Sequence, residues 1–215
     1  MVGSDLYMPV QLHCPKLRLG NEGTAWCICP GELSEASTVY SFGVGEDISF
    51  DLALIERFGL RVEAFDPTPR SNAWLATQRT PDKFIFHSYG IGSRDGTATF
   101  YPENPKFVSY SVVKRDLPSG EAFESPVYRL STILNLLKHK TIDLLKMDIE
   151  GSEYEVIEDL VASRVQVRQL LVEFHHRWPQ LGVEKTRKAI ATLNEAGLRI
   201  FDVSPEGLEY SFLAS

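Results

Sequence analysis

The sequence of 215 residues has few features of membrane or disulfide-rich proteins. No apolar run approaches the ~18 residues that a membrane-spanning helix needs. The N-terminal segment lacks the basic-then-apolar order of a signal peptide. The three cysteines, Cys14, Cys27 and Cys29, are an odd number and all precede residue 30, which does not suit a disulfide framework. We therefore expect a cytoplasmic protein that does not bind membranes.

Positive charge is also scarce. The chain has 22 Lys and Arg against 29 Asp and Glu, so its formal net charge is −7 at pH 7. No run of five basic residues occurs, and a polyanion is repelled by a net negative charge, so we do not expect nucleic acid as a partner. The hydrophobic fraction of 43% is that of an ordinary globular domain, which excludes general disorder.

The cysteines permit one metal hypothesis. His13, Cys14, Cys27 and Cys29 together offer the four ligands that a structural zinc ion takes. The Cys-x-Cys spacing differs from that of common zinc knuckles, however. Half-buried thiols in a reducing compartment are therefore the favoured interpretation.

From residue 39 onward, short β-branched or aromatic runs alternate with segments of helical period, a pattern typical of a parallel sheet wrapped by helices. Two runs near the end of the chain flank Pro205 and Gly207, which suit a tight turn. We predict an α/β fold: a doubly wound, mostly parallel seven-stranded sheet with an antiparallel C-terminal hairpin and helices on both faces. The strands are expected at residues 39–42, 61–65, 84–89, 142–148, 169–174, 199–203 and 208–213, and the helices at 48–58, 71–80, 131–137, from 152 and at 184–196.

We divide the chain into an N-terminal extension, residues 1–38, that packs on or covers the rest, and a Rossmann-like domain, residues 39–215. Beyond a short additional strand at 96–101, residues 102–127 are expected to form an irregular, proline-rich insertion. Long irregular segments in compact domains are often functional, although an elaborated surface loop is the alternative. The side chains suited to covering an acceptor are Lys106, Phe107, Tyr110, Lys114, Arg115 and Phe123.

Gly43-Val44-Gly45 follows the first predicted strand of the domain, at the sheet edge where α/β proteins bind ligands. Ile48 stands where a dinucleotide-binding turn has its third glycine, and Glu46 and Asp47 disfavour a phosphate at the helix start. Asp66 lies 21 residues beyond the turn, the offset of a ribose-binding carboxylate. These features favour S-adenosylmethionine, a nucleoside with a positive charge and no phosphate, over NAD.

Three segments, Val39–Asp47, Ala64–Thr68 and above all Leu145–Glu153, resemble the FkbM family of S-adenosylmethionine-dependent methyltransferases. This resemblance extends over about residues 39–176. It implies a class I methyltransferase sheet, cofactor contacts from the glycine turn and Asp66, and methyl transfer to a hydroxyl of a small metabolite or sugar-like acceptor. Ser41 departs from the acidic residue common at its position. The alternative is therefore a non-catalytic nucleoside-binding or scaffold protein with the same fold.

The expected cofactor site combines the glycine turn, the residues that follow the second strand, and a possible adenine-side loop after the third. With an acidic side chain missing at position 41, Glu46, Asp47 or a water is left to contact the cofactor's ammonium group. The predicted cofactor-binding residues are Gly43, Val44, Gly45, Glu46, Asp47, Asp66, Pro67, Gly90, Ile91 and Asp148.

Lys146, Asp148 and Glu150 alternate at the end of the fourth predicted strand, so they share one face if the strand stays extended to Glu150. The structural alternative is that Lys146 only neutralises Asp148. His175 ends the next strand, and its ordinary pKa suits a general base near neutrality. We predict Lys146, Asp148, Glu150 and His175 as catalytic residues.

The group Asp148, Glu150, Glu173 and His175 also has the chemistry of a Mg²⁺ or Mn²⁺ site. No ligand spacing enforces this, and a metal is not expected. The expected partner is a small hydroxylated acceptor. We expect a monomer, or a homodimer paired through the edge of the C-terminal hairpin.

Overall fold

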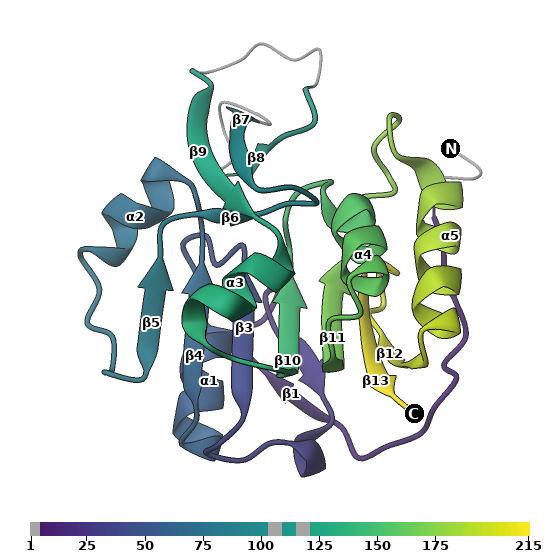
Figure 1. Ribbon diagram of the computed structural model, residues 1–215. Coiled ribbons are helices and arrows are strands. Elements are labelled where there is room, and N and C mark those ends of the chain that lie inside the picture. Colours follow the sequence, from purple (N-terminus) through teal and green to yellow (C-terminus); the bar gives the residue numbers. More distant parts are fainter. Residues whose placement is uncertain (1–4, 103–108, 115–120) are drawn as a thin grey trace.

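The structure is a computed structural model, and it describes residues 5–102, 109–114 and 121–215. Its centre is a seven-stranded sheet (Figure 1) in the order β12-β13-β11-β10-β3-β4-β5. Strand β13 is antiparallel to both of its neighbours, and the strands from β11 to β5 run parallel. The predicted fold class is thereby confirmed. The strands are β3 (Thr38–Phe42), β4 (Arg61–Phe65), β5 (Phe84–His87), β10 (Ile142–Met147), β11 (Val167–Glu173), β12 (Leu198–Val203) and β13 (Glu209–Ala214).

Helices cover both faces of this sheet. Helices α3, α4 and α5 lie on the face turned toward the viewer in Figure 1, and α1 lies behind it. Neighbouring strand residues such as Leu144 and Leu145 belong to the two opposite apolar clusters, and both are fully buried. This burial on both sides explains why the central strands read as continuous apolar runs. The helices are α1 (Ser49–Phe58), α2 (Pro69–Leu75), α3 (Leu130–Leu137), α4 (Glu153–Ala162) and α5 (Gly182–Glu195).

The described part of the N-terminal extension contacts both faces of the sheet. Leu6 is buried in the apolar cluster on the side of α3, α4 and α5, whereas strands β1 (Leu17–Leu19) and β2 (Trp26–Ile28) form an antiparallel pair on the rear face. The backbone of Cys29 donates to Gln169 on β11 and accepts from the same side chain, both at 2.9 Å. The extension is thus bound to the sheet through backbone groups as well as apolar side chains. Within the described residues, no helix is long and apolar enough to span a bilayer.

The region expected to be an irregular insertion contains strands, so that expectation is wrong where the structure describes it. Strands β6 (Gly90–Ile91), β7 (Gly96–Pro102), β8 (Tyr110–Ser111) and β9 (Phe123–Tyr128) form a second sheet in the order β6-β9-β7-β8. It lies beyond the carboxyl ends of the main sheet (Figure 1). The strand predicted at 96–101 is confirmed as β7, whereas Pro126 obscured β9 because proline usually interrupts a strand pattern. The predicted covering residues Lys106, Phe107 and Arg115 lie outside the described residues.

Two helix starts differ from the sequence prediction. Helix α2 begins at Pro69 and ends at Leu75, rather than covering 71–80, because proline suits the first helical position and Thr68 caps the helix by accepting from Ser71 N. Ser152 and Glu155 have the spacing of a capping box at the start of α4, but Ser152 makes no side-chain cap hydrogen bond. Glu153 instead accepts a hydrogen bond from Gly151 N at 3.0 Å.

Strands β3 and β10 come into close contact just beyond their ends. Gly43 has a φ of +74°, and a Cβ built on it would lie 1.7 Å from the carbonyl oxygen of Asp148. No side chain fits there, so only glycine allows this approach. The turn after β3 is therefore seated directly against the turn after β10.

Replacing Gly43 tests this contact. Gly43→Ala is expected to destabilise the fold by more than about 3 kcal/mol, because the clash is with backbone that cannot rotate away. Gly45→Ala is the matched control: Gly45 has a φ of +56° but open space at its Cβ, so only the left-handed strain of about 1–2 kcal/mol applies. Urea denaturation measures both, and equal losses would contradict the close-approach argument.

Candidate functional site

A cavity of about 380 Å³ opens beyond the carboxyl ends of β3, β4 and β10, and residues of the second sheet contribute to its wall. This volume lies within the range of small-molecule sites. Its lining residues are Phe42, Gly43, Gly45, Glu46, Asp47, Phe65, Asp66, Pro67, Thr68, Ser71, Gly90, Ile91, Phe100, Ser109, Tyr110, Asp148, Ile149, Glu150 and Ser152.

All of the predicted cofactor-binding residues except Val44 line this cavity. Val44 is only 3% exposed and packs into the rear apolar cluster. The sequence prediction missed Phe42 and Phe65, although each is the last residue of a strand that leads into a predicted ligand turn. It also missed Phe100, which lies in the strand predicted at 96–101, because the pairing of that strand into a second sheet was not predicted.

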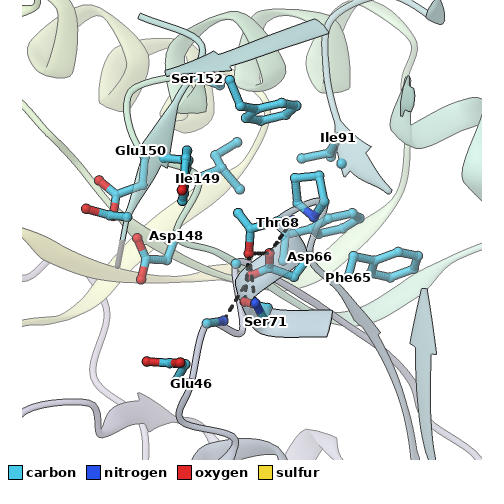
Figure 2. A pocket seen from close by; sticks show the side chains of 18 of the residues that line it. Glu46, Phe65, Asp66, Thr68, Ser71, Ile91, Asp148, Ile149, Glu150 and Ser152 are labelled. Atoms are coloured by element: carbon cyan, nitrogen blue, oxygen red, sulfur yellow. Dashed lines mark hydrogen bonds between the residues drawn. The ribbon is translucent and has the colours of Figure 1, made fainter. Parts of the chain in front are cut away.

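The two ends of the cavity differ in character. Figure 2 shows the ring of Phe65 and the side chain of Ile91 on one side, and the carboxylates of Asp148 and Glu150 on the other. Asp66 lies between them in this view. An apolar end and an acidic end suit a ligand that carries a flat ring at one end and positive charge or hydroxyl groups at the other.

Asp66 directly follows β4, and its carboxylate links the glycine turn to the turn before α2. Its carboxylate accepts from Gly45 N at 2.9 Å and from the backbone N and hydroxyl of Thr68 at 2.8 and 2.6 Å (Figure 2). These donors fix the carboxylate in one orientation at the cavity wall. Asp66 therefore shapes the glycine turn in addition to being available to a ligand.

The acidic pair after the glycine turn is less available than the sequence suggested. Asp47 accepts from Ser49 N at 2.8 Å and from the hydroxyl of Thr24 at 2.9 Å, so its carboxylate caps α1 and holds the N-terminal extension. Glu46 forms a two-pronged ion pair with Arg70, with both contacts at 3.0 Å. Both residues line the cavity, as predicted, but each carboxylate also has partners within the protein.

Lys146 does not share a face with Glu150. Strand β10 ends at Met147 and Glu150 has a φ of +52°, so the alternation stops before it. The buried Lys146 ammonium donates to the carbonyl of Gly43 at 2.8 Å and lies 5.5 Å from the ring centroid of Trp26. Lys146 does not line the cavity. Its hydrogen bond to the Gly43 carbonyl instead supports the glycine turn.

His175 lies between two carboxylates. Its Nε2 is 2.9 Å from Glu150 and its Nδ1 is 2.9 Å from Glu153. Burial lowers the pKa of His175, but the charges and hydrogen bonds of Glu153 and Glu150 outweigh it and raise the pKa well above the ordinary value. The pKa of His175 therefore lies above the near-neutral value expected of a general base, because both neighbouring carboxylates favour the protonated imidazole.

Two other carboxyl groups near His175 have raised pKa values. Burial raises the pKa of Asp148 to about 6, even though the charge of Lys146 opposes the shift. Burial and the charge of Asp148 raise the pKa of Glu173 to about 9, so Glu173 is protonated at neutral pH. Of these two carboxyl groups, only Asp148 has a pKa below neutrality. Asp148 is also the one that lines the cavity.

One cluster within the described residues has the geometry of a metal site. Asp148, Glu150 and His175 each offer a ligand atom, and these atoms all lie within 4.8 Å of one another. Glu173 is not part of the cluster. The zinc hypothesis is wrong: Cys14, Cys27 and Cys29 are free thiols, and no such cluster of described residues includes them.

Removing the charge of Lys146 is expected to make stability depend more strongly on pH. Asp51 is 2% exposed, and burial raises its pKa to about 6 while the Lys146 charge lowers it. A carboxyl whose folded pKa exceeds its unfolded value loses stability as pH rises between the two, so this loss ends near pH 6 in the native protein. In Lys146→Met the folded pKa rises further, and the loss continues above pH 6.

The stability gap between wild type and Lys146→Met is thus expected to widen from pH 6 to pH 8, by up to about 1.4 kcal/mol per pH unit. Urea denaturation at the two pH values measures this gap. Lys188→Met is the control, because Lys188 pairs with Glu158 on the surface. Parallel stability curves for wild type and Lys146→Met would contradict the buried coupling to Asp51.

Comparison with known proteins identifies the family of the chain. Residues 42–200 match the family described as "Methyltransferase FkbM domain". The rat and human proteins named "Probable methyltransferase-like protein 24" are 30% and 28% identical to the chain, over 71% of its length. The chain spans 36% of the length of each of these relatives.

A likeness in fold extends to more distant proteins. The structure of the Methanococcus jannaschii pre-rRNA processing protein fibrillarin superimposes with a TM-score of 0.51 at 10% identity, over 84% of this chain and 67% of that one. At such low identity the likeness concerns the fold alone. The family match covers most of the chain, and the resemblance of the glycine turn and the segment Leu145–Glu153 is confirmed by it. The chain belongs to the FkbM family of methyltransferase domains.

Proposed function

We propose that this domain transfers a methyl group from S-adenosylmethionine to a hydroxyl oxygen of a small metabolite or sugar-like acceptor. The observation that carries the proposal is the graded cavity, with an apolar end at Phe65 and Ile91, the fixed carboxylate of Asp66 and an acidic end at Asp148 and Glu150. The family supports methyl transfer as the chemistry. The choice of an oxygen acceptor is part of the proposal.

The residues present fit the nucleoside part of this cofactor. Gly43 and Gly45 line the cavity without side chains, so a ligand can approach their backbone closely. Gly45 and Thr68 occupy three of the roughly four acceptor positions of the Asp66 carboxylate, which leaves one, on Oδ2, for a ribose hydroxyl. Phe65 and Ile91 offer apolar contact to a flat base. When bound, S-adenosylmethionine supplies an electrophilic methyl group on a positively charged sulfur.

The acidic end has two tasks in this proposal. Asp148 and Glu150 provide negative charge that favours an onium group over a polyphosphate. They also accept hydrogen bonds from an acceptor's hydroxyl groups and so hold an oxygen in line with the methyl group, the positioning on which transfer depends. Lys146 and His175 are positioning residues: Lys146 holds Gly43, and His175 holds Glu150.

Cofactor binding is tested by calorimetry with S-adenosylhomocysteine. Wild type is expected to bind it, and Asp66→Ala to lose about 10–100-fold in affinity, because a ligand hydroxyl and Gly45 N both lose their partner. Asp82→Ala, which replaces an exposed aspartate outside the cavity, is the control and is expected to bind as wild type does. No binding to wild type at millimolar ligand would overturn the proposal.

Turnover separates an enzyme from a non-catalytic nucleoside-binding or scaffold protein. With labelled S-adenosylmethionine and a panel of polyols, glycosides and hydroxy acids, Glu150→Gln is expected to lower methyl transfer by at least about 100-fold, because the acceptor loses a positioning contact. Binding of S-adenosylhomocysteine should remain within a few-fold of wild type. Binding without transfer to any acceptor, in wild type and variant alike, would instead indicate the scaffold.

A further inference from the structure

The strongest unassigned feature is the cluster at the acidic end of the cavity. Asp148 follows β10, Glu150 lies in the turn before α4, and His175 follows β11, so three separate segments bring their side chains together. Two carboxylates and an imidazole form a mixed ligand set of the kind that Mn²⁺ accepts, and Mg²⁺ accepts its oxygens. The ligand atoms lie within 4.8 Å of one another.

The contact between His175 and Glu150 already has the spacing of two metal ligands. The Nε2 and Oε2 atoms are 2.9 Å apart. Two neighbouring ligands at right angles around an ion, with bonds of about 2.1 Å, are separated by about 3.0 Å. An ion can therefore take the place of the proton between these atoms with little movement of either side chain.

Glu153 supplies the second, independent observation. It accepts from His175 Nδ1 at 2.9 Å, the carboxylate–histidine arrangement that orients metal-binding imidazoles through their other nitrogen. Glu153 is fully buried and is itself fixed by the backbone N–H groups of Ile149 and Gly151. Its Oε2 is buried with no hydrogen-bond partner among the described residues.

We propose that Asp148, Glu150 and His175 bind a divalent cation, Mn²⁺ or Mg²⁺, with Glu153 orienting His175. From the sequence alone we expected no metal. The proposal differs because the structure brings these three ligand atoms together. The role of the ion rests on the proposed function: it coordinates the acceptor's hydroxyl beside the cofactor. The acceptor class is then a compound with two neighbouring oxygens, such as a diol or a hydroxy acid, which chelates the ion.

The ion gives the acceptor's hydroxyl a way to lose its proton that does not use His175, whose two ring nitrogens both face carboxylates. A hydroxyl bound to a divalent cation has a lowered pKa, so its proton is released to water at the mouth of the cavity. The oxygen then forms the new C–O bond as the C–S bond breaks, and the electron pair of that bond stays on sulfur to give S-adenosylhomocysteine.

The site is tested by titrating the whole protein with Mn²⁺ and following free Mn²⁺ by electron paramagnetic resonance, without cofactor or acceptor. Wild type is expected to bind one Mn²⁺ with a Kd below about 1 mM, and Mg²⁺ to compete for it. Asp148→Asn is expected to weaken binding at least tenfold. Glu158→Gln, which changes an exposed carboxylate of the same helix that Glu153 begins, is the control and is expected to bind as wild type does.

A pulsed measurement of nitrogen coupling to the bound Mn²⁺ identifies the imidazole ligand. Wild type is expected to show the coupling and His175→Gln to lose it, with thermal unfolding confirming that each variant is folded. If His175→Gln does not fold, Asp148→Asn and the wild-type nitrogen coupling decide the question.

Absence of saturable Mn²⁺ binding in wild type, or equal affinity of wild type and Asp148→Asn, would overturn the metal site. Because this titration uses no cofactor, its result is separate from binding of S-adenosylhomocysteine, on which the proposed function stands or falls.

Discussion

The contact between Gly43 and the backbone of Asp148 is the constraint on which the rest of the site depends. It brings the turn after β3 against the turn after β10, and Lys146 strengthens it by donating to the Gly43 carbonyl. Gly43 and Gly45 of the first turn and Asp148 and Glu150 of the second all line the cavity. Their separation is therefore set by backbone packing, which does not adjust as a flexible side chain would.

Much of the fold was predictable from local sequence. Alternating apolar runs and helical segments identified the strands of the main sheet, because parallel strands buried on both faces leave a strong apolar signal. The glycine turn and the offset to Asp66 were equally visible, since both depend on residues close to strand ends. In the second sheet only β7 was predicted, because β6 and β8 have two residues each and β9 contains Pro126.

The chemical states of the site residues were not predictable in the same way. The direction of Lys146 depends on where β10 ends and on Trp26, which is 120 residues away along the chain. The protonation of His175 depends on Glu153, which approaches only after α4 and β11 have packed. Sequence reasoning recognised the residue types correctly, but partners brought together by tertiary packing determine which of them carry a charge.

The contact between the Trp26 ring and the Lys146 ammonium shows that residues of the N-terminal extension support the site. The segment recognisable by similarity begins at residue 42, after this tryptophan and after the Cys29 backbone that binds Gln169. The family match thus covers the residues that line the cavity, whereas the residues that support them include Trp26 and Cys29, which precede the matched segment. A relative with a different N-terminal segment would need another side chain to contact the ammonium group that corresponds to Lys146.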